Sequence, residues 1–159
     1  MKSRDIVIGI VILAVLGGVI YYRQKNQAID ETRVPQTLSI EREMEDKFKL
    51  EIPDDVDKVE LVDVANGNSS GIATKNFTNG KFEASVLADL PEIKSNEFYQ
   101  AWMVKGDEMV SLGKMKSAKG GWMIDFESST DYSDYNQFMI TKEGKFDNTS
   151  ETKVLEGNF

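Results

Sequence analysis

The chain has 159 residues, no cysteine, no histidine and a formal net charge of −8 at pH 7. The missing cysteine excludes disulfides and thiolate nucleophiles, and the missing histidine excludes Ser-His-Asp catalysis and imidazole metal ligands. From Asn26 onward there are 15 basic and 26 acidic residues, a net charge of 15 − 26 = −11. Because such a surface repels phosphate backbones, we expect no nucleic-acid partner, and we also expect no metal and no cofactor.

An unbroken apolar run extends from Ile6 to Tyr22 and follows the basic residues Lys2 and Arg4. As a helix this run would be about 26 Å long, close to the roughly 30 Å hydrocarbon core of a bilayer. The tyrosines at its end and the basic side chains on both sides suit the membrane interface. We therefore expect residues 1–25 to be a membrane anchor that crosses the lipid bilayer once, through residues 6–22.

A cleaved secretory signal is the main alternative for this run, because a signal also has a basic start and an apolar core. The segment Leu16–Ile20 offers no convincing pair of small residues for cleavage, so we favour a retained anchor. A buried soluble helix is the least favoured reading, since the run has no polar face. Basic residues are nearly balanced across the run, and we expect the C-terminal domain to lie outside the cytoplasm, on the cell membrane.

Residues 26–57 are polar and acidic, contain Pro35 and Pro53, and are expected to form a linker that is partly helical. Ile40, Met44 and Phe48 recur every four residues, a spacing that favours one face of a short helix. Two turns are too few for a coiled coil, so a stalk is preferred over a pairing helix.

Alternation of apolar and polar residues begins at Lys58 and predicts an all-β domain over residues 58–159. The pair Asn79-Gly80 lies between two such segments and indicates a tight hairpin. Short strands at this spacing, without long helices between them, are typical of a β-sandwich or barrel. The expected strands are Lys58–Val64, Ile72–Thr78, Lys81–Ala88, Phe98–Val104, Met109–Lys116, Trp122–Glu127, Gln137–Lys142 and Lys153–Leu155.

A series of short motifs connects this domain with a known family. The most specific is Tyr-Gln-x-Trp, formed by Tyr99, Gln100 and Trp102. The other motifs are Gly71-Ile72-Ala73, Ala88-Asp89-Leu90-Pro91, Leu112-Gly113 and Val154-Leu155-Glu156-Gly157. In this order and spacing the motifs resemble the extracytoplasmic C-terminal domain of anti-sigma-K factors, over residues 59–158. The resemblance implies an immunoglobulin-like antiparallel β-sandwich of about seven strands, held outside the membrane by one span.

The resemblance is limited on the N-terminal side of the apolar run. In the family, the cytoplasmic side carries a helical domain that sequesters a sigma factor, whereas only Met1 to Asp5 precede the run here. We therefore expect no direct sigma-factor binding from this chain. The proline-rich closing segment common in the family is also missing, which leaves the position of the last strand open.

What the resemblance implies is the outer module alone, a membrane-anchored, non-enzymatic domain for protein interaction or sensing. Its expected partner is another envelope or membrane protein. The alternative from a different class is a tethered module that binds a small envelope ligand or cell-wall glycan.

Aromatic residues supply the candidate interaction patch. Tyr132, Tyr135 and Phe138 lie in or beside a polar loop, and we expect them to form an exposed patch. The remaining large aromatics alternate along strands and are expected in the core, because each buries a large apolar area. These core candidates are Tyr99, Trp102, Trp122 and Phe126.

Two weaker motifs point to catalysis and to metal binding. Ser111 and Lys114 match the S-x-x-K of penicillin-binding enzymes, but no K-T-G follows and Ser111 lies in a strand pattern. A hydrolase that uses this pair, or a pair of carboxylates, is therefore only the third hypothesis. Asp131, Asp134 and Asn136 could supply oxygen ligands, yet their spacing does not follow a calcium-binding loop. We expect a solvated loop there.

Overall fold

The computed structural model describes residues 39–159, which form one helix, α2 (Ile40–Phe48), and nine strands. The Asn79-Gly80 turn is the predicted hairpin, with positive φ at both residues (55° and 76°). The strands are β1 (Asp57–Asp63), β2 (Ser70–Thr78), β3 (Lys81–Asp89), β4 (Phe98–Lys105), β5 (Glu108–Lys114), β6 (Lys116–Ala118), β7 (Gly121–Ser128), β8 (Gln137–Glu143) and β9 (Thr152–Asn158).

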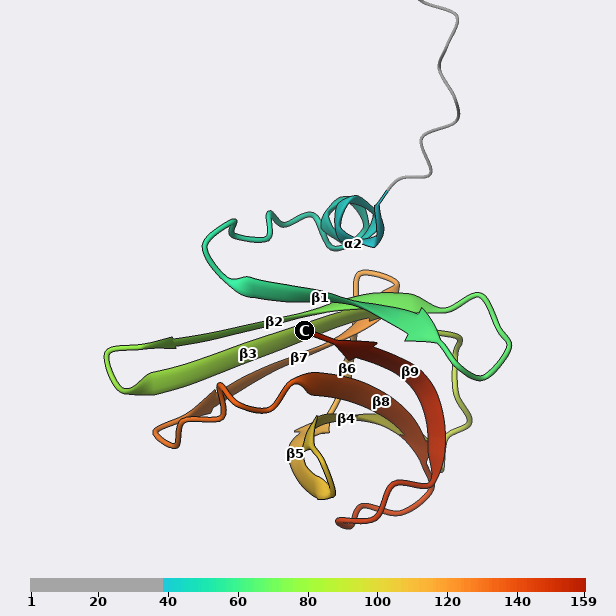
Figure 1. The fold of residues 1–159 in the computed structure, drawn as a ribbon. Coiled ribbons are helices and arrows are strands. Elements are labelled where there is room, and N and C mark those ends of the chain that lie inside the picture. The colour runs from blue at the N-terminus through green and yellow to red at the C-terminus, as the bar shows by residue number, and fades with distance from the viewer. Residues whose placement is uncertain (1–38) are drawn as a thin grey trace, which may run out of the picture. The chain divides into compact units, whose positions relative to one another are not determined.

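All nine strands belong to one antiparallel sheet with the order β5-β4-β8-β9-β1-β2-β3-β7-β6. The sheet curls until it is nearly a barrel, with β4, β5 and β8 below β1, β2 and β3 in Figure 1. The predicted all-β antiparallel class is confirmed. The division into two immunoglobulin-like sheets is not confirmed, because β1 and β9 join the halves through two residue pairs, Val62 with Glu156 and Asp63 with Leu155.

The predicted strand Met109–Lys116 is two strands in the structure, so the eight expected strand ranges become nine strands. Gly113 has a φ of 117°, and a bulge interrupts the pairing of β4 with β5 between Ala101 and Trp102. The Met115 backbone N–H still donates to the Tyr99 carbonyl of β4 at 2.8 Å, and the chain leaves β4 after this bond. Consequently β5 and β6, which occupy the two ends of the strand order, follow one another in sequence through Met115.

The concave side of the curled sheet encloses the main hydrophobic core, here called the inner core. On β3 the side chains of Phe82, Ala84, Val86 and Ala88 all point into it, as the alternation predicted. The buried members of the inner core are Val59, Leu61, Ala73, Phe82, Ala84, Val86, Ala88, Leu90, Tyr99, Ala101, Met103, Leu112, Met115, Trp122, Phe138, Ile140, Val154 and Leu155.

A second hydrophobic cluster, here called the outer layer, forms where α2 packs on the convex side of β2 and β3 (Figure 1). Its buried members are Met44, Phe48, Ile52, Ile72 and Leu87. This layer explains why Leu87 is buried although it faces away from the inner core. Among the described residues, α2 and the sheet belong to one compact unit.

The ends of α2 are defined by local interactions. The Ser39 side chain accepts a hydrogen bond from the Arg42 backbone N–H, and Lys49 ends the helix with a φ of 52°. The Lys119 amine donates to the Phe48 carbonyl. A Cβ on Gly121 would lie 2.6 Å from the Phe48 ring, so the missing side chain at Gly121 makes room for the helix.

The predicted membrane span from Ile6 to Tyr22, and with it the anchor at residues 1–25, lies outside the described residues. Within residues 39–159 no helix has the length and hydropathy needed to cross a bilayer.

Candidate functional site

The three residues of the Tyr-Gln-x-Trp motif lie on two faces of β4. Tyr99 points into the inner core, where its ring packs edge-on against Trp122 with centroids 5.0 Å apart. Its hydroxyl donates to the Pro91 carbonyl at 3.2 Å, and burial, followed by the nearby Glu97 and Glu92, raises its pKa. Tyr99 therefore stabilises the link between β3 and β4.

Gln100 and Trp102 lie on the opposite face, where Gln100 contacts the loop from Gly144 to Glu151 and Trp102 packs with Val104 and Met139. Trp102 donates its indole N–H to the Thr141 hydroxyl at 2.8 Å. The Gln100 amide nitrogen donates to the Ser111 hydroxyl at 2.9 Å and to the Asp147 carbonyl at 3.4 Å. Both motif residues are almost fully buried. The motif thus holds a loop against β4 and presents no side chain to solvent.

The predicted aromatic patch is not exposed as a whole. Phe138 is buried at 1% exposure because it lies at an inward position of β8, so its inclusion in an exposed patch is wrong. Tyr132 and Tyr135 are half-buried and pack edge-on against each other with centroids 5.4 Å apart. Tyr132 also packs against Phe82 of the inner core. These tyrosines close one end of the curled sheet.

Lys75, which the sequence did not single out, holds the loop that carries these tyrosines. Its side chain is 5% exposed, and its amine donates to the carbonyls of Ser133 (2.8 Å) and Tyr135 (2.7 Å). The amine also lies 4.2 Å from the centroid of the Phe159 ring. Burial lowers the pKa of Lys75. The position of Lys75 could have been detected from the alternation of β2, because residue 75 falls on the same face of the strand as the buried Ala73.

The candidate catalytic pair has separate partners. The Ser111 hydroxyl accepts from Gln100, whereas the Lys114 amine lies over the rings of Phe98 (3.7 Å from the centroid) and Phe146 (5.0 Å). No hydrogen bond joins Ser111 and Lys114 in the described part of the chain.

The candidate calcium ligands are likewise engaged in other interactions. Asp131 accepts from the backbone and hydroxyl of Ser133, which lowers its pKa, and Asp134 pairs with Lys105. Among residues 39–159 no three acidic side chains are grouped in a way that could hold a metal ion.

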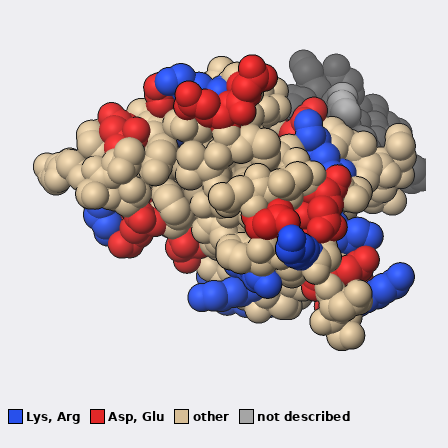
Figure 2. Space-filling view, turned by 90° about the horizontal axis from the view of Figure 1, so that it is seen from below, with Lys and Arg blue, Asp and Glu red and all other residues tan. Residues whose placement is uncertain are grey.

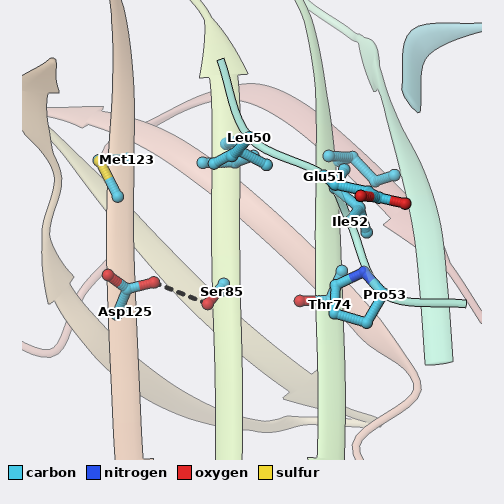
Figure 3. Close-up of a pocket in the computed structure, with 10 residues that line it drawn as sticks. Leu50, Glu51, Ile52, Pro53, Thr74, Ser85, Met123 and Asp125 are labelled. Atoms are coloured by element: carbon cyan, nitrogen blue, oxygen red, sulfur yellow. Dashed lines mark hydrogen bonds between the residues drawn. The ribbon is translucent and has the colours of Figure 1, made fainter. Parts of the chain in front are cut away.

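A groove, here called the central groove, lies on the convex side of the sheet. The segment Leu50–Pro53 passes over β2 and β3 and forms one wall, as Figure 3 shows. Thr74, Ser85 and Asp125 lie below it on three neighbouring strands, and Ser85 donates to Asp125 at 2.7 Å. The groove holds about 190 Å³. Its lining residues are Leu50, Glu51, Ile52, Pro53, Ile72, Thr74, Ser85, Leu87, Met123 and Asp125.

Two further hollows adjoin the central groove and share residues with it. One, of about 170 Å³, shares Pro53, Thr74 and Ser85. The other, of about 370 Å³, shares Met123 and Asp125 and reaches the edge strand β6. We call the three together the furrow. It runs across β2, β3 and β7 to β6, and the outer layer under α2 borders it.

The charges beside the central groove are acidic. Glu51 and Asp125 are both exposed, and neither forms an ion pair with any residue in the described range 39–159. Apart from these two carboxylates the lining is apolar or carries a hydroxyl. Figure 2, by contrast, shows acidic and basic side chains interspersed on the face seen from below. The central groove therefore combines a mainly apolar lining with two carboxylates that form no ion pair among the described residues, while Lys116 lines the hollow beside it at β6.

The sequence alone did not predict the central groove, although it contains patterns that place some of its residues. Leu50-Glu51-Ile52 alternates and ends at a proline, and Ser85 and Asp125 lie at the polar positions of their strands. The register of β2, β3 and β7 brings Thr74, Ser85 and Asp125 side by side, and no local pattern predicts that register.

The size of the central groove restricts what can bind in it. Pockets that enclose drug-sized ligands usually hold about 300 to 1,000 Å³, more than the 190 Å³ found here. One or two aliphatic side chains from another protein would fit. The geometry thus suits a contact with a protein segment better than an enclosed small molecule.

The sequence profile of one family, described as anti-sigma-K factor rskA, C-terminal, matches residues 7–152. The match begins inside the apolar run and ends at the first residue of β9. No curated protein and no solved structure matches the chain. Because the matched residues make up most of the sequence and include the Tyr-Gln-x-Trp motif, the chain belongs to the family of anti-sigma-K factor C-terminal domains.

Proposed function

We propose that this protein is a membrane-anchored regulatory module whose all-β domain stands outside the cytoplasm and binds another envelope or membrane protein. Membership in the anti-sigma-K factor family supports a regulatory role. The apolar run from Ile6 to Tyr22 supports the single-pass anchor. We further propose that the halves of the sheet on either side of the short β1–β9 pairing correspond to the two layers of an immunoglobulin-like sandwich.

The observation that carries this function is the furrow. Its central groove is lined mainly by apolar side chains, it lies on a regular sheet surface, and its wall of Leu50–Pro53 follows α2 after Lys49. Interface cores that bind proteins are apolar and well packed, with polar groups around them. The furrow has this arrangement on a small scale.

The non-enzymatic part of the proposal is supported by the surroundings of the only catalytic motif that the sequence offered. Ser111 is half-buried and hydrogen-bonded to Gln100, and the Lys114 amine interacts with aromatic rings. A serine nucleophile needs a base within hydrogen-bonding reach. The pair therefore serves loop packing in this proposal.

A tethered binder of a small ligand or cell-wall glycan is the second candidate, and one observation favours it. Phe146 is 56% exposed and lies beside Phe98, with ring centroids 6.1 Å apart. Exposed aromatic rings can serve as platforms for sugar rings. Lys114 already lies over both rings, however, so this platform is partly occupied.

Two measurements test this proposal: the side of the membrane on which the domain lies, and the contact between the furrow and a partner protein. A reporter fused after Phe159 should be active only outside the cytoplasm. A photo-crosslinking amino acid at Ser85, in the floor of the furrow, should form a discrete protein adduct in intact cells. The same group at Thr78, at the far end of β2, is the control and should give no such adduct. A reporter active in the cytoplasm, or labelling equal at both positions, would contradict the proposal.

A further inference from the structure

We infer that the furrow binds a short, extended, basic segment of the partner protein, with an aliphatic side chain between Leu50 and Met123 and a lysine or arginine beside Asp125 or Glu51. This inference rests on the proposed function and adds the chemistry of the partner. Length, surface chemistry and charge of the furrow each contribute to it.

The length of the furrow fits a few residues of extended chain. From β2 across β3 and β7 to β6 there are three strand-to-strand spacings of about 4.8 Å each, roughly 14 Å in all. An extended chain advances about 3.3 Å per residue, so about four residues would span this distance. The binding segment is therefore a short peptide stretch and not a domain surface.

The apolar floor selects for an aliphatic side chain. Ile72, Leu87 and Ile52 are buried in the outer layer, and Leu50 and Met123 are half-buried where the central groove opens. Methionine adapts its shape to different neighbours because its side chain is unbranched. A leucine or isoleucine placed here would remove the exposed parts of Leu50 and Met123 from water, which favours binding.

The charges beside the floor select for a basic residue next to the aliphatic one. Asp125 is held in place by Ser85, so its carboxylate is already oriented at the furrow. Glu51 lies on the opposite wall, on the segment that follows α2. Lys75 does not compensate for them, because its amine is engaged with the carbonyls of Ser133 and Tyr135. Lys116 lines the adjoining hollow together with Asp125 but forms no ion pair among residues 39–159. A partner lysine or arginine in the central groove would therefore meet two carboxylates that no described cation pairs with.

The negative charge argues against three other kinds of partner. Anionic lipid headgroups and nucleic-acid phosphates would both be repelled by Asp125 and Glu51. A second copy of this acidic domain would bring like charges together, since residues from Asn26 onward carry a net charge of −11. A basic protein segment is the occupant that the surface complements.

The test uses the full-length chain in non-ionic detergent and a fluorescent peptide, Lys-Leu-Lys-Leu-Lys, capped at both ends. We expect saturable binding by fluorescence anisotropy that weakens as salt is added. The matched peptides Glu-Leu-Glu-Leu-Glu and Lys-Ala-Lys-Ala-Lys should bind much more weakly. Equal binding of the acidic peptide, or no saturable binding of the basic one, would overturn the inference.

Two pairs of protein variants locate the binding. Asp125→Lys should weaken binding about five- to tenfold, whereas Asp107→Lys, the same charge change in the β4–β5 turn, should change it less than about twofold. Thr74→Trp should fill the central groove and abolish binding, whereas Thr78→Trp on the same strand should not. Binding that survives Thr74→Trp in a folded protein shows that the peptide lies elsewhere.

The result also separates this inference from the proposed function. If Ser85 crosslinks to a protein in cells but the basic peptide fails to compete for that crosslink, the inferred basic segment is wrong. The proposed role in protein binding is then kept. If no crosslink and no peptide binding are found, both fail.

Discussion

The inner core and the outer layer differ in size and in how they are built. Among the described residues, the inner core contains eighteen buried side chains from strands and their connections, and the outer layer contains five. Burial of apolar area is the main stabilising term in folding, so the inner core determines whether the domain folds. The outer layer determines whether α2 stays on the sheet.

This difference indicates that α2 can open without global unfolding. The helix is held by the Phe48 side chain over Gly121, by Lys119 at its C-terminal end and by the ion pair of Lys47 with Asp89. Elements with few buried contacts open at lower free energy than the core. Because the wall of the furrow directly follows α2, opening of the helix would also take the furrow apart.

The largest expected effect comes from the inner core. Phe82→Ala should lower the free energy of unfolding by about 3 to 5 kcal/mol, because Phe82 is fully buried and packs against Phe126 and Tyr132. Urea unfolding followed by tryptophan fluorescence measures this, since Trp102 and Trp122 are both buried in the sheet. Phe77→Ala, at a 39% exposed position, is the control and should cost less than about 1 kcal/mol.

Phe48→Ala breaks the outer layer and should have a smaller global effect, about 2 to 3 kcal/mol, because the helix can leave the sheet before the core unfolds. Hydrogen exchange should show loss of protection at residues 40–50 while the strands keep theirs. An equal loss of protection in α2 and in β3 would contradict the claim that α2 opens independently of the inner core.

Gly121→Ala disturbs the contact of the Phe48 ring with the sheet by changing the residue on β7. The new methyl group would lie 2.6 Å from the Phe48 ring and 2.9 Å from the Ala88 carbonyl, so the helix or the strand must shift. We expect a loss of about 1 to 3 kcal/mol, measured by urea unfolding. Gly144→Ala is the matched control, since only the Glu151 carboxylate lies near its Cβ, at 3.6 Å and beyond. Similar losses in both variants would contradict a specific role for Gly121.

The smallest effect concerns a loop that belongs to neither layer. The Asp63 carboxylate accepts backbone hydrogen bonds from Gly67, Ser69 and Ala65, which lower its pKa. A lowered pKa means that this stabilisation is present above the ordinary aspartate value, about 3.9, and is lost as the pH falls through the lowered value. Asp63→Asn should remove this acid sensitivity.

Amide exchange of residues 64–69, followed from about pH 6 downward through the acid range in the parent protein and in Asp63→Asn, measures the loop directly. The loop should loosen in acid, and α2 should stay protected, if the loop is independent of both layers. Loss of protection in α2 at the same pH would show that the two regions are coupled.

The fold class could be predicted from the sequence because strands with one buried face carry their own signal. The alternation along β3 predicted its inward residues, and Asn79-Gly80 predicted its hairpin. The alternation could not show that β5 and β6 pair with different neighbours, because a change of partner leaves the pattern of side chains unchanged.

The candidate site could be predicted only in fragments. The Tyr-Gln-x-Trp motif indicated the family, yet its residues are buried and hold a loop. The furrow depends on the register of three strands and on the path of Leu50–Pro53, and both are set by tertiary packing. Phe138 was misplaced for a related reason: the residues that precede it are polar, but its side chain points inward from β8.

The strand order has one further consequence. Eight hydrogen-bonded pairings link the nine strands in a row, and the peptide link through Met115 connects the two ends of that row into a closed circuit. A backbone cut at Met115 would therefore leave every pairing in place while converting the circuit into an open strip. New chain ends at this position would reveal how much of the curvature comes from the closure and how much from the twist of the strands themselves.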